Sequence, residues 1–176
     1  VYGVLDTQMN RENTYVQAQE HSQLTMRYVL LSKNEATVQA KIFSKLSASH
    51  TRSDVQILSI VSEAWKIKLD GCIQIGKGIV GANANLIEEN LFLGSTGSVQ
   101  WIPTLLVGSD DVQASHACRM EKISDEKLFY LRSRWIAKDD SIKTMLEGYI
   151  TTNLSGLKDH QEELYTEVFD RIISQI

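Results

Sequence analysis

Proline and cysteine are both scarce in this chain of 176 residues, which contains one proline, Pro103, and two cysteines, Cys72 and Cys118. Two thiols are too few for a disulfide framework or for a cluster site of four cysteines, and they suit a reducing compartment. A single proline leaves nearly every segment free to pair on both sides of a sheet. We therefore expect a cytoplasmic protein held together by its apolar core.

An excess of positive charge is also absent, since 18 Lys and Arg residues face 22 Asp and Glu residues, for a net charge of −4. This balance excludes a nucleic-acid binder that relies on neutralising phosphates. No apolar run reaches the length of a bilayer span, and residues 1–4 lack the positive charges of a signal peptide. We expect neither a membrane span nor a leader. Hydrophobic residues make up 43% of the chain, enough for one medium domain with a sizeable core.

Motifs for catalysis are missing as well. The sequence contains no Gly-x-Ser-x-Gly, no His-Glu-x-x-His and no Walker-type phosphate loop. The one glycine-rich candidate, Gly76-Lys77-Gly78, lacks the spacing and the hydroxyl group that phosphate and magnesium require. We therefore expect no enzyme.

Apolar and polar residues alternate over much of residues 14–123. This period of two predicts half-buried strands rather than helices. Turn signals recur through this region, at 32–34, 49–51, 70–71, 76–78 and 94–97, which is typical of many short strands. Periodicity alone leaves a sandwich and a β-solenoid both open, and no strict sequence repeat is visible. The alternating apolar sets are Leu24/Met26/Tyr28, Val38/Ala40/Ile42, Val55/Ile57, Trp65/Ile67/Leu69 and Val112/Ala114.

Downstream of Ser124 the apolar period becomes helical. Ser124 can cap a first helix whose face would carry Leu128, Leu131 and Trp135. A second helix is predicted over 139–154 with Gly156 as its stop, and a third begins with a capping box at Asp159 and Glu162. We expect these helices to pack on one another or to cover an open end of the β-region.

Residues 109–134 are the most distinctive stretch. An acidic pair, Asp110-Asp111, precedes Ser115-His116, and a short spacer leads to the block Leu128–Arg134, Leu-Phe-Tyr-Leu-Arg-Ser-Arg. At this spacing the stretch resembles the C-terminal signature of the SufB/SufD family, scaffold proteins of SUF-type iron–sulfur cluster assembly. Residues 76–94 are similar to the asparagine-containing rungs that precede this signature.

The resemblance implies a mainly β fold, a right-handed parallel β-helix over residues 1–123, followed by a C-terminal helical domain over 124–176. Family members are longer and begin with a helical domain, so the similarity is to their C-terminal half. The resemblance implies a non-catalytic scaffold subunit that works with a SufB-like scaffold partner and a SufC-like ABC-type ATPase. The acidic pair before Ser-His favours a SufD-like member. The alternative is a β-helix enzyme acting on polysaccharide or acyl substrates, for which neither convergent carboxylates nor a hexapeptide repeat is found.

The chain departs from the family pattern at three places. Trp135 replaces the glycine that follows the Arg-x-Arg block, and an indole is poorly suited to a left-handed helix end, so we expect a rebuilt turn there. Ala117 and Cys118 follow the histidine where the family has Gly-Ala or Glu-Ala. Ala114 stands where SufD-type members often have cysteine.

His116 is the candidate ligand for iron or a nascent cluster, because the family histidine at this position lies at the scaffold interface. Its alternative role is that of a hydrogen-bonded structural residue. Cys118 lies two residues further and would share a face with His116 on a strand, whereas its alternative role is that of a small buried hydrophobe. Asp110 and Asp111 are read as a solvated turn. The remaining histidines, His21, His50 and His160, are read as surface residues, and Cys72 as a packing residue at a turn.

The block after the histidine is the candidate partner interface. One histidine and one cysteine cannot hold a cluster, so the resemblance implies no cofactor bound stably by this chain alone, with iron or an iron–sulfur cluster held only in the assembled complex. The interface residues are Leu128, Phe129, Tyr130, Arg132 and Arg134.

Overall fold

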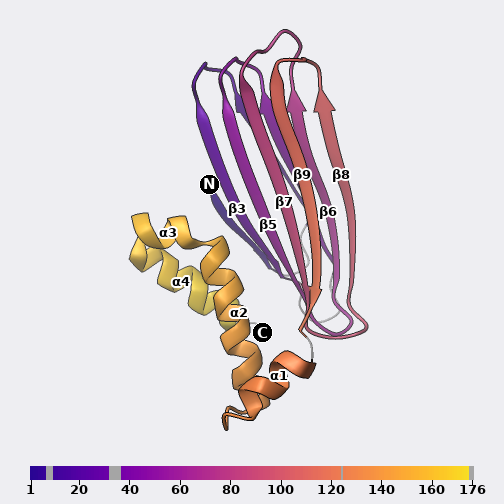
Figure 1. Cartoon of the computed structure of the whole chain (residues 1–176), viewed down its shortest axis with the longest axis vertical. Helices are drawn as coiled ribbons and strands as arrows, with labels where there is room; N and C mark the ends of the chain where they lie inside the picture. Colours follow the sequence, from indigo (N-terminus) through magenta and orange to yellow (C-terminus); the bar gives the residue numbers. More distant parts are fainter. Residues whose placement is uncertain (7–9, 32–36, 124, 175–176) are drawn as a thin grey trace.

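A computed structural model describes residues 1–6, 10–31, 37–123 and 125–174. Within these described residues, nine strands come first and four helices follow (Figure 1). The strands form two parallel sheets, one with the order β1-β3-β5-β7-β9 and the other with the order β2-β4-β6-β8. Their bounds are β1 Tyr2–Asp6, β2 Asn10–Gln17, β3 Gln23–Leu31, β4 Thr37–Leu46, β5 Arg52–Val61, β6 Lys66–Ile75, β7 Ala82–Phe92, β8 Ser98–Val107 and β9 Val112–Lys122.

The chain winds as a β-solenoid in which each turn adds one strand to each sheet. In the larger sheet Arg27 pairs with Gln56, Gln56 with Ile87, and Ile87 with Ala117, so one turn takes about thirty residues. Every strand pair is parallel, as a coil that always advances in one direction requires. The mainly β solenoid that the family resemblance implied is therefore confirmed.

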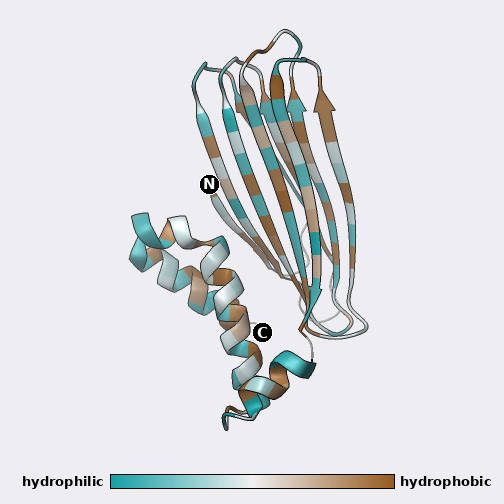
Figure 2. Ribbon diagram, viewed as in Figure 1, coloured by the Kyte–Doolittle hydropathy of each residue, from teal (hydrophilic) through white to brown (hydrophobic). Residues whose placement is uncertain are grey.

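The apolar core lies between the two sheets and consists of the inward half of each alternating strand. Along β4, buried Val38, Ala40 and Ile42 alternate with partly exposed Gln39 and Lys41. Figure 2 shows this alternation as bands of opposite hydropathy along the strands. The period of two in the sequence thus reports which side chains enter the solenoid.

Two details of the strand prediction need correction. The strands begin well before residue 14, because β1 and half of β2 precede it. Asp70-Gly71 is not a turn but lies inside β6, where Gly71 faces the interior, and the turn signal at 32–34 lies outside the described residues. The signals at 49–51, 76–78 and 94–97 are confirmed as loops between strands. The dipeptide forms no turn because the neighbouring strands β4 and β8 both pair with β6 through this position.

The helices are α1 Asp125–Arg132, α2 Lys138–Asn153, α3 Ser155–His160 and α4 Glu162–Ile173. The predicted stop at Gly156 is wrong, since α2 ends at Asn153 and Gly156 lies within α3. The predicted capping box is also wrong, because Asp159 belongs to α3 and α4 follows Gln161, which makes no side-chain cap. Ser124, the predicted cap of the first helix, lies outside the described residues. Among the residues that the structure describes, no helix has the length and apolar character needed to cross a lipid bilayer.

The helices cover the outer face of the five-stranded sheet, beside β3 and β5 (Figure 1). Leu58 and Ile60 point away from the solenoid interior and are buried by this layer, together with apolar residues of α2. The expectation that the helices cover an open end of the coil is therefore wrong. Burial of two apolar surfaces against each other outweighs the protection of a strand edge. The cluster comprises Val29, Leu31, Leu58, Ile60, Leu91, Ile123, Leu128, Leu146, Ile150, Leu154, Leu157, Tyr165 and Ile172.

Glu121, near the end of β9, connects the two layers. Its carboxylate accepts hydrogen bonds from Lys127 of α1 and from the Tyr149 hydroxyl of α2, and these bonds hold the pKa of Glu121 below its usual range. Burial, and next the bond to Glu121, raise the pKa of Tyr149 to about 12. The first two helices are thus attached to the last strand by polar contacts as well as by apolar packing.

Candidate functional site

His116 faces the solenoid interior from β9, the last strand of its sheet. Ala114 and Val112 lie on the same side of the strand and pack against the core, and Leu86 is the register partner of His116 on β7. Nε2 of His116 lies 2.9 Å from Oε2 of Glu88. The His116 side chain remains 21% exposed, because no further strand pairs with β9 among the described residues. The histidine is therefore held by the interior and still reachable by solvent.

Glu88, the partner of His116, is a fully buried carboxylate on β7. One of its oxygens binds His116, and the other, Oε1, has no hydrogen-bond partner. Burial raises the pKa of the Glu88 carboxyl above its usual range, and the hydrogen bond with His116 opposes that increase. Opposite this carboxylate lies Gly71 of β6, whose missing side chain provides the space: a Cβ there would lie 2.5 Å from Oε1.

Cys118 lies on the same face of β9 as His116, as the spacing predicts for a continuous strand. Its register partner is Glu88, and its Sγ accepts a hydrogen bond from Nδ2 of Asn90 at 3.6 Å. The residue is exposed, so the alternative role of a buried hydrophobe is wrong. Burial of the sulfur, and next the charge of Glu88, raise the pKa of the Cys118 thiol, while Asn90 opposes the increase. A metal ion would have to compete with a proton for this sulfur.

Polar side chains gather around Glu88 in the solenoid interior. Ser59 of β5 pairs in register with Asn90 of β7, two positions beyond Glu88 on the same face. The atoms Ser59 Oγ, Glu88 Oε1 and Asn90 Oδ1 are all buried without a hydrogen-bond partner. Buried polar atoms without partners are costly, so their gathering around the partner of His116 indicates a site rather than packing.

Glu88 and Asn90 were not predicted as site residues. The alternation along β7 could have revealed Glu88. Ala82, Ala84 and Leu86 point inward and are buried, and Glu88 is the next residue in this alternation. A charged residue at an inward position of a strand is a stronger indication of function than a histidine taken alone. Detecting it required the strand to be placed correctly first.

The other candidate ligands lie elsewhere. Asp110 and Asp111 form an exposed turn before β9, in agreement with a solvated turn. Cys72 is buried in the middle of β6, so the placement at a turn is wrong, although its role in packing holds, and burial raises the pKa of its thiol. The described residues contain no group of three or more His, Cys, Asp or Glu side chains placed to hold a metal ion. His116 and Cys118 by themselves therefore supply only two ligands.

The solenoid ends at β8 and β9 with apolar side chains exposed. Leu105 and Val107 continue the inward phase of β8 and remain 39% and 46% exposed, and Met120 of β9 is 55% exposed. Within the described residues neither strand has a partner on its outer side. Unpaired strand edges next to exposed core side chains are a surface that another sheet can extend.

The predicted interface block divides into two groups. Leu128 is buried at 7% exposure in the core beneath the helices, which leaves little of it for a partner to contact. Phe129 and Tyr130 point outward and are 72% and 61% exposed, and the Arg134 guanidinium lies 5.5 Å from the Tyr130 ring centroid. Arg132 is exposed on the same helix, α1. The block therefore presents an aromatic and basic surface beyond the end of β9.

Trp135, the departure from the family pattern, follows this block. It adopts a positive φ of 66° and is 98% exposed. The left-handed turn is thus kept with an indole in the place of glycine, and the expected rebuilding is wrong. Trp135 also lies beyond the end of α1, so it does not share a buried face with Leu128.

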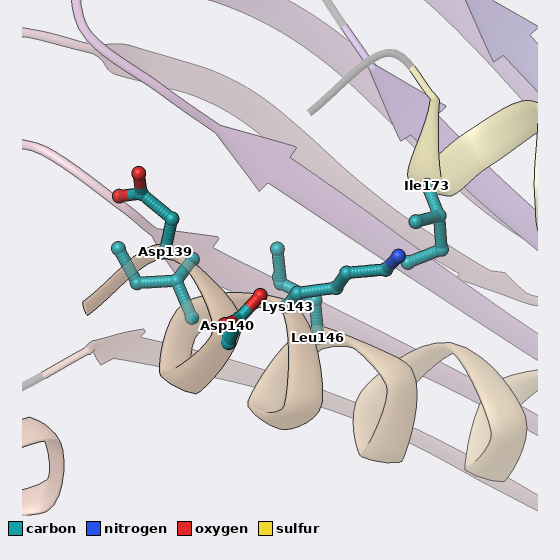
Figure 3. Close-up of a pocket in the computed structure, with 6 residues that line it drawn as sticks. Asp139, Asp140, Lys143, Leu146 and Ile173 are labelled. Carbon is teal, nitrogen blue, oxygen red and sulfur yellow. The ribbon is translucent and has the colours of Figure 1, made fainter. Parts of the chain in front are cut away.

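A cavity of about 250 Å³ lies between the start of α2 and the end of α4. Figure 3 shows Lys143 extending from α2 toward Ile173 of α4, with Leu146 below. The lining of this cavity comes from α2 and α4 and carries no histidine or cysteine. We assign it no part in the site.

Comparison with known proteins identifies the family. A family model described as SUF system FeS cluster assembly, SufBD core domain, matches residues 1–149. The chain is 30% identical over 114 residues to the iron–sulfur cluster assembly protein SufD of Escherichia coli, covering 65% of this chain and 26% of that protein. It is 30% identical to a SufBD family protein of Staphylococcus saprophyticus over 63% of this chain and 23% of that protein. It is 27% identical to SufB of Bacillus subtilis over 58% and 22%. The matched segment thus spans about a quarter of these relatives, and the chain belongs to the SufBD core-domain family of the SUF system for iron–sulfur cluster assembly.

Proposed function

We propose that this chain is a SufD-like, non-catalytic scaffold subunit that pairs with a SufB-like subunit and a SufC-like ATPase. The observation that carries the proposal is the open end of the solenoid, where β8 and β9 expose their edges and the inward side chains Leu105, Val107 and Met120 beside His116. Two such ends joined edge to edge would continue both sheets and bury these side chains. His116 and Cys118 would then lie at the junction of the two subunits.

The substrate in this proposal is iron, or a nascent iron–sulfur cluster, held between the subunits. Imidazole and thiolate are ligands for ferrous iron. Because this chain offers too few ligands for a cluster, the partner must supply the remainder. The lack of a phosphate-binding motif in the sequence supports an ATPase on a separate subunit, and we assign that subunit to the exposed surface around Phe129 and Tyr130.

The edge interface is tested by placing a charge on either face of β8. Val107→Lys puts an ammonium group on the inward face at the open end, whereas Leu106→Lys puts one on the outward face of the same strand. After co-expression with a SufB-like subunit, we expect Val107→Lys to abolish co-purification and Leu106→Lys to reduce it far less. Equal retention of the partner by both variants would rule out the edge-to-edge arrangement.

The ATPase surface is tested by Phe129→Ala and Tyr130→Ala, because exposed side chains can be truncated without loss of the core. Removal of residues 138–176 would be a poor test, since it uncovers Leu58 and Ile60 of the sheet. We expect each truncation to weaken ATPase binding by roughly tenfold or more, the effect of losing an aromatic interface anchor, while Glu126→Gln on the same helix leaves it unchanged. Unchanged binding in both aromatic variants would place the ATPase elsewhere.

The chemistry is tested in the assembled complex by anaerobic reconstitution with iron and sulfide. We expect His116→Ala to reduce the cluster absorbance without weakening subunit association. If the variant forms clusters normally, or if it unfolds the chain, His116 is a structural residue.

A further inference from the structure

Glu88 is in an environment that disfavours a carboxylate. It is fully buried between the sheets, and only one of its oxygens has a polar partner, His116. An apolar side chain at this inward position would avoid the cost of removing a carboxyl group from water. Gly71, on the facing strand, leaves the space that the carboxylate occupies. The pair of Glu88 and Gly71 therefore forms a built polar position in the apolar core.

The contact with His116 determines what the imidazole can offer. As an ionised carboxylate, Glu88 only accepts hydrogen bonds, and Nε2 of His116 then carries the proton in the 2.9 Å contact. In a neutral imidazole the lone pair is then on Nδ1. Histidines that bind metals commonly donate their second ring N–H to a carboxylate, which orients the ring and selects the tautomer. The geometry of Glu88 and His116 corresponds to this arrangement.

We propose that Glu88 is the positioning residue of His116: it holds the ring with Nε2 protonated, so that Nδ1 is the nitrogen that binds iron. This inference deepens the proposed function, since it concerns how the same site receives its metal. Glu88 acts through the histidine and does not itself bind the metal. Gly71 enables it by leaving the carboxylate room.

Cys118 and Asn90 extend the same arrangement. Cys118 is the register partner of Glu88 on β9, and the amide of Asn90 donates to its sulfur. This hydrogen bond opposes the rise of the Cys118 thiol pKa that burial and the charge of Glu88 cause, without reversing it, so a metal ion must displace the thiol proton. One imidazole nitrogen and one thiolate form a half-site for ferrous iron or for cobaltous ion, which has similar ligand preferences and serves as a spectroscopic probe.

The first test measures the tautomer of His116 in the full 176-residue chain. Nitrogen-15 NMR reports which ring nitrogen carries the proton, and His116→Gln assigns the signals among the four histidines. We expect the Nε2–H form in the wild type, and a mixture of tautomers in Glu88→Leu, which fills the site with an apolar side chain. Glu89→Gln is the matched control, because Glu89 is the next residue on β7 but pairs with Arg119 on the outside. An Nδ1–H form in the wild type, or an unchanged tautomer in Glu88→Leu, would overturn the proposal.

The second test titrates the same variants with cobaltous ion alone under anaerobic conditions. We expect Glu88→Leu to weaken binding about tenfold or more, the usual effect of losing a carboxylate that orients a ligating histidine. Glu88→Gln keeps the shape and one acceptor oxygen, and we expect it to fall between Glu88→Leu and the wild type. Sulfur-to-cobalt charge-transfer absorption should disappear in Cys118→Ser. Equal affinities of wild type and Glu88→Leu would contradict a positioning role.

The two tests separate this inference from the proposed function. Neither uses a partner subunit, sulfide or an ATPase, so a chain that fails to assemble a SUF complex can still pass both. If the chain assembles normally, but the His116 tautomer and the cobalt affinity are unchanged in Glu88→Leu, the scaffold function stands and the positioning role of Glu88 is wrong. Because Glu88→Leu replaces a buried carboxyl by a hydrocarbon, we expect it to fold, and Glu88→Gln provides the isosteric check.

Discussion

Arg27 of β3 and Asp54 of β5 form an ion pair on the outer face of the larger sheet, with Nη2 and Oδ2 2.5 Å apart. Oδ1 of Asp54 accepts a hydrogen bond from Nδ2 of Asn85 at 3.2 Å, and Asn85 in turn accepts one from Ser115 at 2.7 Å. These contacts connect β3, β5, β7 and β9 at one level of the coil. They lie on the part of the outer face that the helical layer does not cover. Asp54, Asn85 and Ser115 line a polar groove there.

Asp54 is the shared acceptor in this ladder, and we predict that Asp54→Ala lowers the free energy of unfolding by about 1–3 kcal/mol, because a partly buried guanidinium and an amide lose their acceptor. Urea denaturation measures the change. Glu89→Ala, which removes the more exposed pair with Arg119, is the control and should cost less than about 1 kcal/mol. Equal losses in the two variants would show that the ladder adds nothing beyond surface charge.

Trp135 occupies a left-handed conformation at φ 66° without burying its indole. We predict that Trp135→Gly raises the free energy of unfolding by roughly 1 kcal/mol, because glycine adopts positive φ without the steric cost that a Cβ imposes. Trp135→Ala removes the indole but keeps the Cβ, and should therefore remain near the wild type. If alanine stabilises the chain as much as glycine, the gain in the free energy of unfolding comes from removal of the exposed indole and not from relief of backbone strain. Chemical denaturation of the three proteins distinguishes these outcomes.

Gly71→Ala should destabilise the solenoid by about 1–3 kcal/mol, since the new methyl group would lie 2.5 Å from Oε1 of Glu88 and 3.0 Å from Leu86. We predict that Glu88→Ala removes most of this penalty in the double variant, because the nearer of the two contacts is gone. The four proteins form a thermodynamic cycle that measures the coupling. An additive cycle would mean that Gly71 is required for its backbone and not for the space it leaves.

Glu63 holds the loop between β7 and β8, where its carboxylate accepts hydrogen bonds from the backbone of Ser95 and Thr96 and from the Thr96 hydroxyl. These bonds, that from the hydroxyl first, lower the pKa of Glu63. A carboxyl whose pKa is lower in the folded state stabilises the fold above its unfolded-state pKa of about 4.3, and this stabilisation disappears as the pH falls through the folded-state value.

We accordingly predict that Glu63→Gln lowers the melting temperature at pH 7, and that the difference from the wild type shrinks as the pH falls below about 4. Thermal unfolding across that pH range measures it. Glu20→Gln, at an exposed turn, serves as the control for the general effect of removing one carboxylate. A constant difference at every pH would mean that shape, and not charge, holds the loop.

The strands of this protein follow from local alternation, and the sequence determined them well. The phase of Val38, Ala40 and Ile42, or of Ile67 and Leu69, is the same in the sequence and in the solenoid interior. Alternation is a local consequence of strand geometry, so it survives without knowledge of the neighbours. The helices after residue 124 follow from the same reasoning, although their ends did not, because α3 begins directly after α2 and contains both Gly156 and Asp159.

The winding of the strands into a solenoid could not be predicted from local alternation. His21 and His50 occupy equivalent corners of successive turns with φ of 60° and 57°, and their rings stack 5.0 Å apart. The sequence around each indicated only a surface residue. A solenoid of this kind repeats backbone geometry and the inward phase, neither of which requires the same amino acid at the same place in each turn.

Some residues of the candidate site were predictable from the sequence, and others only from the fold. His116 and Cys118 were recognisable from a short segment, because two residues on one strand face share a side whatever the fold. Glu88, 28 positions before His116, became its partner only because one turn of the coil takes about thirty residues, and Gly71 opposes it only because the second sheet faces the first. The sequence by itself determined which residues point inward. The tertiary structure decided which of them meet, since contacts between turns depend on the number of residues that each turn consumes.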